Sequence, residues 1–221
     1  LMLTDGVNLT TIELDEGEKI PNDLNKFDAM FCMGGPMDTW MEKDYPWLAD
    51  EKKRIKEFVI DLKKPYLGFC LGCQLLGEVV GGKVVKSNSP EIGMLNVNFL
   101  ENKKNDLLFN EFPDKITSLQ WHSYEAKDLE NNKDITLLAS SSETKYQIFK
   151  YQKHAYGIQF HIEVKDSTVG EWGCVPEYKS ALEKQLGENA LQKFDKDAKA
   201  HMSNLNKYSE ILYKNFKKLV Q

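Results

Sequence analysis

The chain contains one cysteine that is flanked by glycines on both sides, in the segment Gly68-Phe69-Cys70-Leu71-Gly72. An apolar run typical of a strand precedes this segment, and a run typical of a helix follows it. The pattern is the cysteine form of the G-x-S-x-G turn, which presents a nucleophile at a strand-to-helix junction. Side chains at the flanking positions would collide in so sharp a turn. The amides and dipole at the helix N-terminus favour a thiolate, so Cys70 is a candidate nucleophile.

A histidine and an acid two residues apart could serve such a nucleophile as base and orienting acceptor. His161 ends the apolar strand 156–160, and Glu163 follows it. In extended backbone, residues i and i+2 point to the same side. Glu163 can therefore accept a hydrogen bond from one imidazole nitrogen while the other nitrogen faces Cys70. Alone, this pair is more often a histidine at a strand end beside a surface acid; together with the glycine-flanked cysteine it predicts a catalytic triad.

Two backbone amides are candidates for stabilising a developing oxyanion. The amide of Leu71 follows the nucleophile at the helix N-terminus. The turn Gly34-Gly35-Pro36 exposes an amide that no side chain covers, although this motif is also common in ordinary turns.

The elements around these residues predict an α/β fold with a mostly parallel central sheet, flanking helices and an antiparallel extension. Strands joined by helices, as in the first half of the chain, imply parallel pairing. Later strands with short turns between them imply an antiparallel edge. The predicted strands are 8–14, 28–33, 66–69, 92–99, 115–121, 134–140, 145–150 and 155–161, and the predicted helices begin near Trp47 and cover 71–80.

Residues 1–221 are predicted to form one domain with a helical extension from about residue 176. An apolar stripe on this extension should pack against the body of the domain; it consists of Leu205, Tyr208, Leu212, Phe216 and Leu219. Asp5-Gly6 indicates a turn into the strand at 8–14. We therefore expect an earlier N-terminal strand, with any targeting signal, to be absent from the sequence.

The composition excludes several classes of function. The chain is 41% hydrophobic and 29% charged, as ordinary globular proteins are, and its net charge of −5 offers no footprint for nucleic acid or an anionic membrane. No apolar run is long enough to span a bilayer, and no signal peptide is visible. Four cysteines fit reduced thiols in a cytoplasmic enzyme better than a disulfide framework, and the Cys and His positions lack metal-ligand spacing.

Three separated segments resemble one family, the class I (triad-type) glutamine amidotransferases. These segments are Gly34-Gly35-Pro36, the stretch 68–74 that ends in Cys73-Gln74, and Gln159-Phe160-His161-Ile162-Glu163. The stretch Pro90-Glu91-Ile92-Gly93 and the turn Trp121-His122-Ser123 are similar to the stand-alone, GMP-synthase-like branch. The resemblance implies a flavodoxin-like fold.

The resemblance also implies roles for individual residues. Cys70 would be the nucleophile, His161 the base and Glu163 the orienting acid, with oxyanion donors from the amides of Gly35 and Leu71. Further contacts with the substrate would come from Gln74, His122, Ser123 and Tyr124. Two positions depart from the family's pattern: Ile162 stands where proline is usual, and Tyr124 stands where related proteins often have aspartate.

The implied reaction is hydrolysis of the side-chain amide of glutamine or a γ-glutamyl compound through a cysteine thioester, without a metal or organic cofactor. The released ammonia would pass to a separate synthetase subunit or be lost. Two alternatives stay open at this point. Cys70-x-x-Cys73 has the spacing of a thiol–disulfide oxidoreductase, and the chain could be a catalytically silent regulatory subunit.

Overall fold

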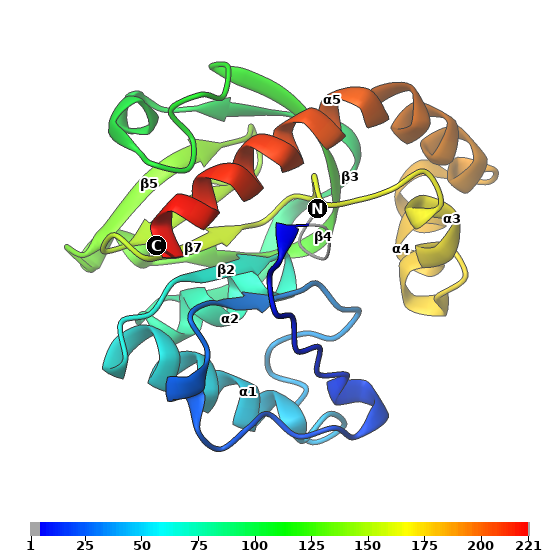
Figure 1. The fold of residues 1–221 in the computed structure, drawn as a ribbon. Helices are drawn as coiled ribbons and strands as arrows, with labels where there is room; N and C mark the ends of the chain where they lie inside the picture. Colours follow the sequence, from blue (N-terminus) through cyan, green and yellow to red (C-terminus); the bar gives the residue numbers. More distant parts are fainter. Residues whose placement is uncertain (1–4, 221) are drawn as a thin grey trace.

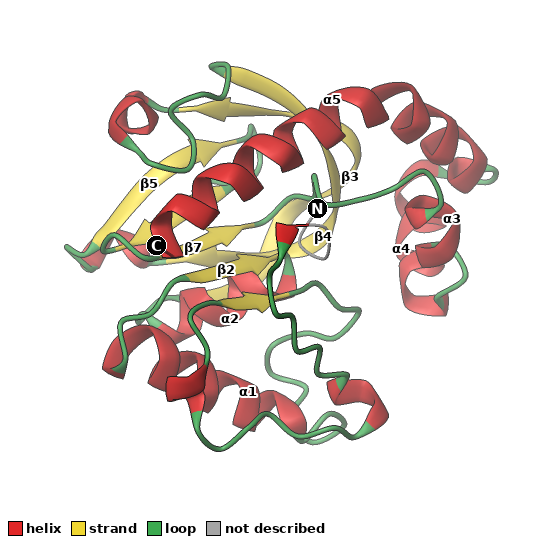
Figure 2. Ribbon diagram, in the orientation of Figure 1, coloured by secondary structure: helices red, strands yellow, loops and turns green. Residues whose placement is uncertain are grey.

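A seven-stranded sheet with helices on both faces organises residues 5–220, which are the residues that the computed structural model describes (Figures 1 and 2). The strand order is β1-β2-β7-β6-β5-β3-β4. The strands are β1 (Met30–Cys32), β2 (Tyr66–Phe69), β3 (Lys83–Phe99), β4 (Lys115–Lys127), β5 (Ile135–Ser140), β6 (Ile148–Tyr151) and β7 (Ala155–Ile158). The helices are α1 (Trp47–Lys56), α2 (Leu71–Val79), α3 (Thr168–Trp172), α4 (Pro176–Leu186) and α5 (Ala190–Val220).

The α/β fold with an antiparallel extension is confirmed, and its parallel part is confined to β1, β2 and β7. In these strands Gly68 is paired with both Cys32 and Gly157. The remaining strand pairs are antiparallel. Because parallel strands end at the same edge of a sheet, the segments that follow β1, β2 and β7 all leave from one edge.

Two apolar clusters cover the two faces of the sheet. On one face, α1 and α2 bury Leu48, Ile55 and Leu76. On the other face, α5 runs across the sheet, with α1 and α2 on the far side (Figure 1). The predicted stripe on α5 is confirmed, because its members are buried or partly buried in this second cluster: Leu205, Tyr208, Leu212, Phe216 and Leu219. None of the helices in residues 5–220 has the length and apolar character needed to cross a membrane.

The prediction of a strand at 8–14 is wrong. The segment 7–13 has no regular structure, and a short 3₁₀ turn covers Leu14–Glu16. Among residues 5–220 its alternating pattern finds no neighbouring strand to pair with, and Leu9 is 46% exposed. Alternation alone does not make a strand, since a strand also needs a partner for its backbone groups.

Other element bounds differ from the predicted ones in the second half of the chain. Strand β3 begins at Lys83, nine residues before the predicted start at 92, because its first half is polar and gains order by pairing with β4. The helical extension is interrupted between α4 and α5, where Gly187 and Asn189 have φ values of 80° and 62°. Helix α3 was not predicted, since five residues are too few to show a helical period.

Candidate active site

The turn between β2 and α2 holds Cys70 in a backbone conformation that few residues adopt, with φ 49° and ψ −102°. Positive φ is strained for a residue with a Cβ and persists only where the surroundings enforce it. The glycines allow this close approach. A Cβ on Gly68 would lie 2.5 Å from the carbonyl carbon and oxygen of Gly72, and a Cβ on Gly72 would overlap the Cys32 carbonyl. The turn therefore requires glycine on both sides of Cys70.

The backbone of Cys70 is tied to both neighbouring elements. Its N–H donates to the carbonyl of Ile158 over 2.8 Å, and its own carbonyl accepts from the Gln74 N–H at 3.0 Å. The side-chain amide nitrogen of Gln159 lies 3.7 Å from the Cys70 Sγ. These contacts hold Cys70 at the edge of the sheet where β2 and β7 end. The residue as a whole is 7% exposed.

The imidazole of His161 lies next to the carboxylate of Glu163. The Glu163 Oε1 lies 2.5 Å from the His161 Nδ1. The backbone of His161 forms an antiparallel bridge with Leu119 of β4, which fixes the position of the His161 Cα, from which the ring projects. The other carboxylate oxygen of Glu163 accepts the N–H of Ile162 at 2.9 Å. Proline at position 162 would have no N–H to donate, so this departure supplies a hydrogen bond that steadies Glu163.

The electrostatics of His161 favour the protonated ring. Burial alone lowers the pKa of His161, but the Glu163 charge and hydrogen bonding with Glu163 and Cys70 raise it to about 10.

The Gly34-Gly35-Pro36 turn lies against both of these side chains. A Cβ placed on Gly34 would be 3.1 Å from the His161 Cε1 and 3.4 Å from the Cys70 Cβ. A Cβ on Gly35 would be 3.2 Å from the Leu71 Cδ2. Segments that are far apart in the sequence therefore meet at one point on the edge of the sheet.

The amides of Gly35 and Leu71 are free to bind an external acceptor. Within residues 5–220, neither N–H donates a hydrogen bond to the protein. Both follow turns next to the thiol of Cys70, where an oxyanion would develop during attack. They stay candidates for the oxyanion hole on this basis.

The four residues predicted to contact substrate differ in how far they are buried. Tyr124 and Ser123 are partly exposed, whereas Gln74 and His122 are 5% and 6% exposed. The Gln74 side-chain nitrogen donates to the Tyr124 carbonyl at 3.0 Å and to the Gln159 Oε1 at 3.3 Å. Gln74 is thus linked through Gln159 to the nucleophile.

His122 belongs to a buried polar network that also includes Glu91. Its Nδ1 lies 3.0 Å from the Tyr124 carbonyl, and its Nε2 lies 3.1 Å from the Gln120 Oε1 and 3.5 Å from the Glu91 Oε2. Gln147 donates to Glu91 and accepts from Gln120. Burial raises the pKa of Glu91, but hydrogen bonding and charge from His122 help to hold it below its usual value. Because both ring nitrogens face protein acceptors, the contacts of His122 hold the backbone of β4 at Tyr124 in place.

Aromatic side chains from α3 and α4 pack around His161 and Trp121, and no sequence motif pointed to them. The Trp172 ring packs edge-on against His161, with centroids 4.7 Å apart. Tyr178 packs against Trp172 and Trp121. Burial and then the charge of Cys70 raise the pKa of Tyr178. No local pattern marks these contacts, because α3 is a single short turn.

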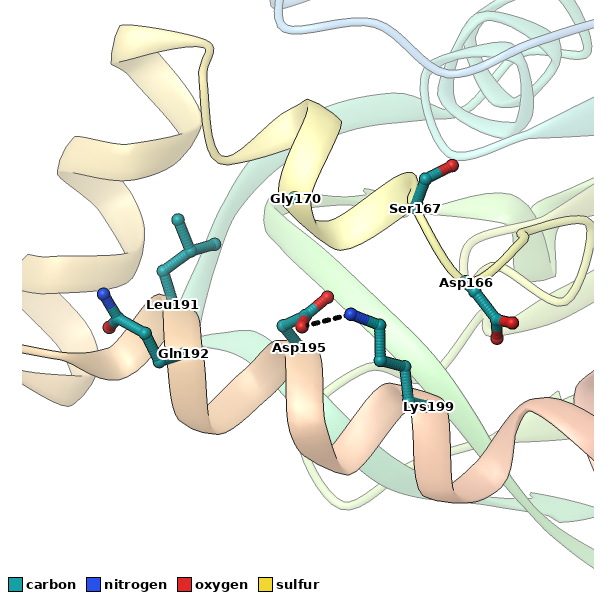
Figure 3. Close-up of a pocket in the computed structure, with 7 residues that line it drawn as sticks. All are labelled: Asp166, Ser167, Gly170, Leu191, Gln192, Asp195 and Lys199. Atoms are coloured by element: carbon teal, nitrogen blue, oxygen red, sulfur yellow. Dashed lines mark hydrogen bonds and ion pairs between the residues drawn. The ribbon is translucent and has the colours of Figure 1, made fainter.

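A cavity of about 380 Å³ lies outside this cluster, between the start of α3 and the first half of α5 (Figure 3). Asp195 and Lys199 form an ion pair of 2.6 Å across its floor. None of Cys70, His161 and Glu163 lines it. Within the described part of the chain, no group of three or more His, Cys, Asp or Glu side chains is arranged to hold a metal ion.

Comparisons with known proteins agree with this arrangement. The family model "Glutamine amidotransferase class-I" matches residues 2–172. The chain is 32% identical over 154 residues to one of the subunits of a glutamine-hydrolysing GMP synthase from Sulfolobus acidocaldarius, covering 69% of this chain and 76% of that protein. It is 31% identical over 160 residues to the same subunit from Saccharolobus solfataricus, covering 72% and 79%.

The fold also matches solved structures over the whole chain. A crystal structure of a glutamine amidotransferase from Thermotoga maritima aligns with a TM-score of 0.84 and 28% identity, and the alignment covers 100% of this chain and 90% of that one. The family match extends over more than half of the chain and includes all three motifs of the site. The chain therefore belongs to the class I glutamine amidotransferase family.

Proposed function

We propose that the protein hydrolyses the side-chain amide of glutamine or of a γ-glutamyl compound through a thioester on Cys70, and releases ammonia or an amine. His161 acts as base and then acid, and Glu163 orients it. The amides of Gly35 and Leu71 bind the oxyanion. One observation carries the proposal: the side chains of Cys70 and His161 both lie against Gly34 of the Gly-Gly-Pro turn.

The chemistry follows from these positions. The Cys70 sulfur, after giving its proton to His161, attacks the amide carbon and forms a tetrahedral oxyanion. The C–N bond then breaks while His161 returns the proton to the leaving nitrogen. Water, activated by His161, attacks the thioester, frees the carboxylate product and restores the thiol.

The surroundings of Cys73 weigh against a thiol–disulfide oxidoreductase. Cys73 is 0% exposed, and its sulfur would lie 2.9 Å from a Cβ on Gly157, under the sheet. Burial raises the pKa of the Cys73 thiol well above its usual value. A resolving cysteine needs an accessible sulfur that ionises readily, and Cys73 has neither property.

Two cysteine variants test the proposal against both alternatives. Cys70→Ala should lower glutamine hydrolysis by several orders of magnitude, since triad members act as a unit, whereas Cys73→Ala should keep most of the activity. The assay measures ammonia release from glutamine and from γ-glutamyl amines. A diazo-ketone analogue of glutamine should label Cys70 alone. Wild-type protein without any such activity or labelling would support a silent regulatory subunit, and loss of activity in Cys73→Ala would support redox chemistry.

A second candidate role concerns the fate of the ammonia. Two relatives are named as subunits of a glutamine-hydrolysing GMP synthase, which supports transfer of ammonia from this chain to a separate synthetase subunit. We also propose that residues 1–221 form a single domain that works in the cytoplasm, in keeping with four free cysteines. Affinity purification from the source cells should recover a synthetase that accelerates glutamine hydrolysis if the subunit role holds, and a stand-alone hydrolase would be unaffected by other proteins.

A further inference from the structure

We propose that the carboxylate of Asp38 binds the α-ammonium group of the substrate, which restricts the enzyme to glutamine and γ-glutamyl compounds with a free amino group. This inference rests on the proposed function and deepens it. It assigns a specificity-determining role to a residue outside the triad and outside the three family motifs.

The loop that carries Asp38 is in contact with the active site on both sides of this residue. Before it, Gly35 lies against Leu71 next to the nucleophile. After it, the ring of Trp40 packs edge-on against Tyr124, with centroids 4.7 Å apart. Asp38 is therefore held between the oxyanion turn and the strand β4 segment that lines the mouth of the site.

Hydrogen bonds fix this loop in place. The hydroxyl of Thr39, which is 0% exposed, donates to the Glu78 carboxylate of α2 over 2.7 Å. Lys52 of α1 pairs with Glu78 and with Glu42, each at 2.9 Å. The backbone of Asp38 closes a turn through the Met41 N–H at 3.0 Å. A carboxylate on such a loop is positioned before a ligand arrives, which reduces the entropy lost on binding.

The Asp38 carboxylate lacks a partner of its own. Within residues 5–220 it forms neither an ion pair nor a side-chain hydrogen bond, and burial raises its pKa. An anion that loses water without gaining a cation is destabilised. A cation supplied by a ligand would remove this penalty, so the site is suited to a positively charged group.

Tyr124 connects this loop to Cys70. Its ring packs against Trp40, two residues after Asp38, and burial and then the negative charge of Asp38 raise the pKa of Tyr124. The carbonyl of Tyr124 accepts from Gln74, and Gln74 contacts Gln159, whose amide lies 3.7 Å from the Cys70 sulfur. A substrate with its amide at Cys70 and its ammonium near Asp38 would span this short path.

The neighbouring side chains fit an ammonium group better than a metal ion. The rings of Tyr124 and of Trp40, which is 48% exposed and follows Asp38 by two residues, pack together at the end of this loop, and aromatic faces attract organic cations. A divalent metal would need several ligands, and among the described residues no group of three or more His, Cys, Asp or Glu side chains could hold one. One carboxylate on a loop that packs against an aromatic pair matches a single positive charge.

Substrate pairs that differ only in the ammonium group test the proposal. The pair is glutamine and 4-carbamoylbutanoate, which is glutamine without its α-amino group. Asp38→Asn should raise the KM for glutamine by about 10- to 100-fold, the loss typical of a hydrogen bond to a charged group, with kcat changed by less than about threefold. The KM for 4-carbamoylbutanoate should stay the same. Asp44→Asn, which removes the same charge from an exposed position of the same loop, is the matched control and should leave both values unchanged.

Calorimetric binding in a Cys70→Ala background separates this inference from the proposed function. There, Asp38→Asn should weaken glutamine binding by a similar factor and leave 4-carbamoylbutanoate unaffected. Equal losses for both ligands, no loss for either, or no glutamine binding at all would overturn the role of Asp38, whatever the turnover of the wild type. Failure of the proposed function would instead be recognised from wild-type protein that hydrolyses no γ-glutamyl amide.

Discussion

At the scale of single residues, burial lowers the pKa of His161, neighbouring charges and hydrogen bonds raise it, and their combined effect is the larger. The ring is 2% exposed, yet the nearby Glu163 carboxylate and Cys70 raise its pKa to about 10. The protonated ring is therefore favoured below pH 10, and in the proposed reaction it is the form that protonates the leaving nitrogen. The associated stabilisation is complete below the unfolded pKa of about 6.5 and is lost as pH rises through about 10.

Replacement of the orienting acid should move this titration. Glu163→Gln removes the negative charge, so the pKa of His161 should fall and the alkaline limb of kcat/KM should shift to lower pH. Turnover at the optimum should fall by about 100-fold or more, because the ring also loses its orienting acceptor. The measurement is a pH–rate profile between pH 6 and pH 11, with the exposed Glu171→Gln as control. An alkaline limb at the same pH in wild type and Glu163→Gln would refute the role of Glu163.

At the scale of elements, the turn from β2 to α2 depends on two backbones that approach too closely for side chains. Gly68 sits over the carbonyl of Gly72, and Gly72 sits against Cys32 of β1. The same contact that presents Cys70 also joins α2 to the first two strands. The geometry of the nucleophile and the packing of the sheet are therefore inseparable here.

A methyl group at Gly68 should destabilise the fold. Gly68→Ala places a Cβ 2.5 Å from backbone atoms that cannot rotate away, so we expect a loss of at least about 3 kcal/mol in the free energy of unfolding. Gly170→Ala is the control, because nothing lies within 4 Å of a Cβ there and α3 should gain up to about 1 kcal/mol. Urea denaturation measures both. A Gly68→Ala protein as stable as the wild type would contradict the steric argument.

At the scale of the whole molecule, α5 joins the end of the chain to its first strand. Phe216 is 2% exposed and packs edge-on against Phe31 of β1, with ring centroids 4.9 Å apart. The helix covers the sheet face opposite α1 and α2 (Figure 1). The helical extension is thus part of the core that supports the catalytic edge.

Truncation of this aromatic side chain should weaken the whole fold. Phe216→Ala should lower the free energy of unfolding by about 3–5 kcal/mol, the range for a buried aromatic ring. Lys214→Ala, on the exposed side of the same helix, should change it by less than about 0.5 kcal/mol. Equal denaturation midpoints for the two variants would show that α5 does not contribute to the core.

The sequence alone was sufficient for the features that depend on short spacings. The bounds of β2 and the start of α2 follow from a local apolar run and two glycines, and they agree with the structure. The proximity of Glu163 to His161 follows from the two-residue period of extended backbone. The stripe on α5 follows from the helical period. Each of these patterns lies within one short segment, so each can be recognised without knowledge of the fold.

Only the tertiary structure decided which distant residues meet. The pairing of Glu91 with His122, the packing of Trp172 on His161 and the packing of Trp40 on Tyr124 join segments whose separation in sequence has no fixed period. The same limit explains the segment 8–14, whose alternation implied a strand that has no neighbour to complete its hydrogen bonds. Local pattern determines what an element can be, whereas the available partners determine what it becomes.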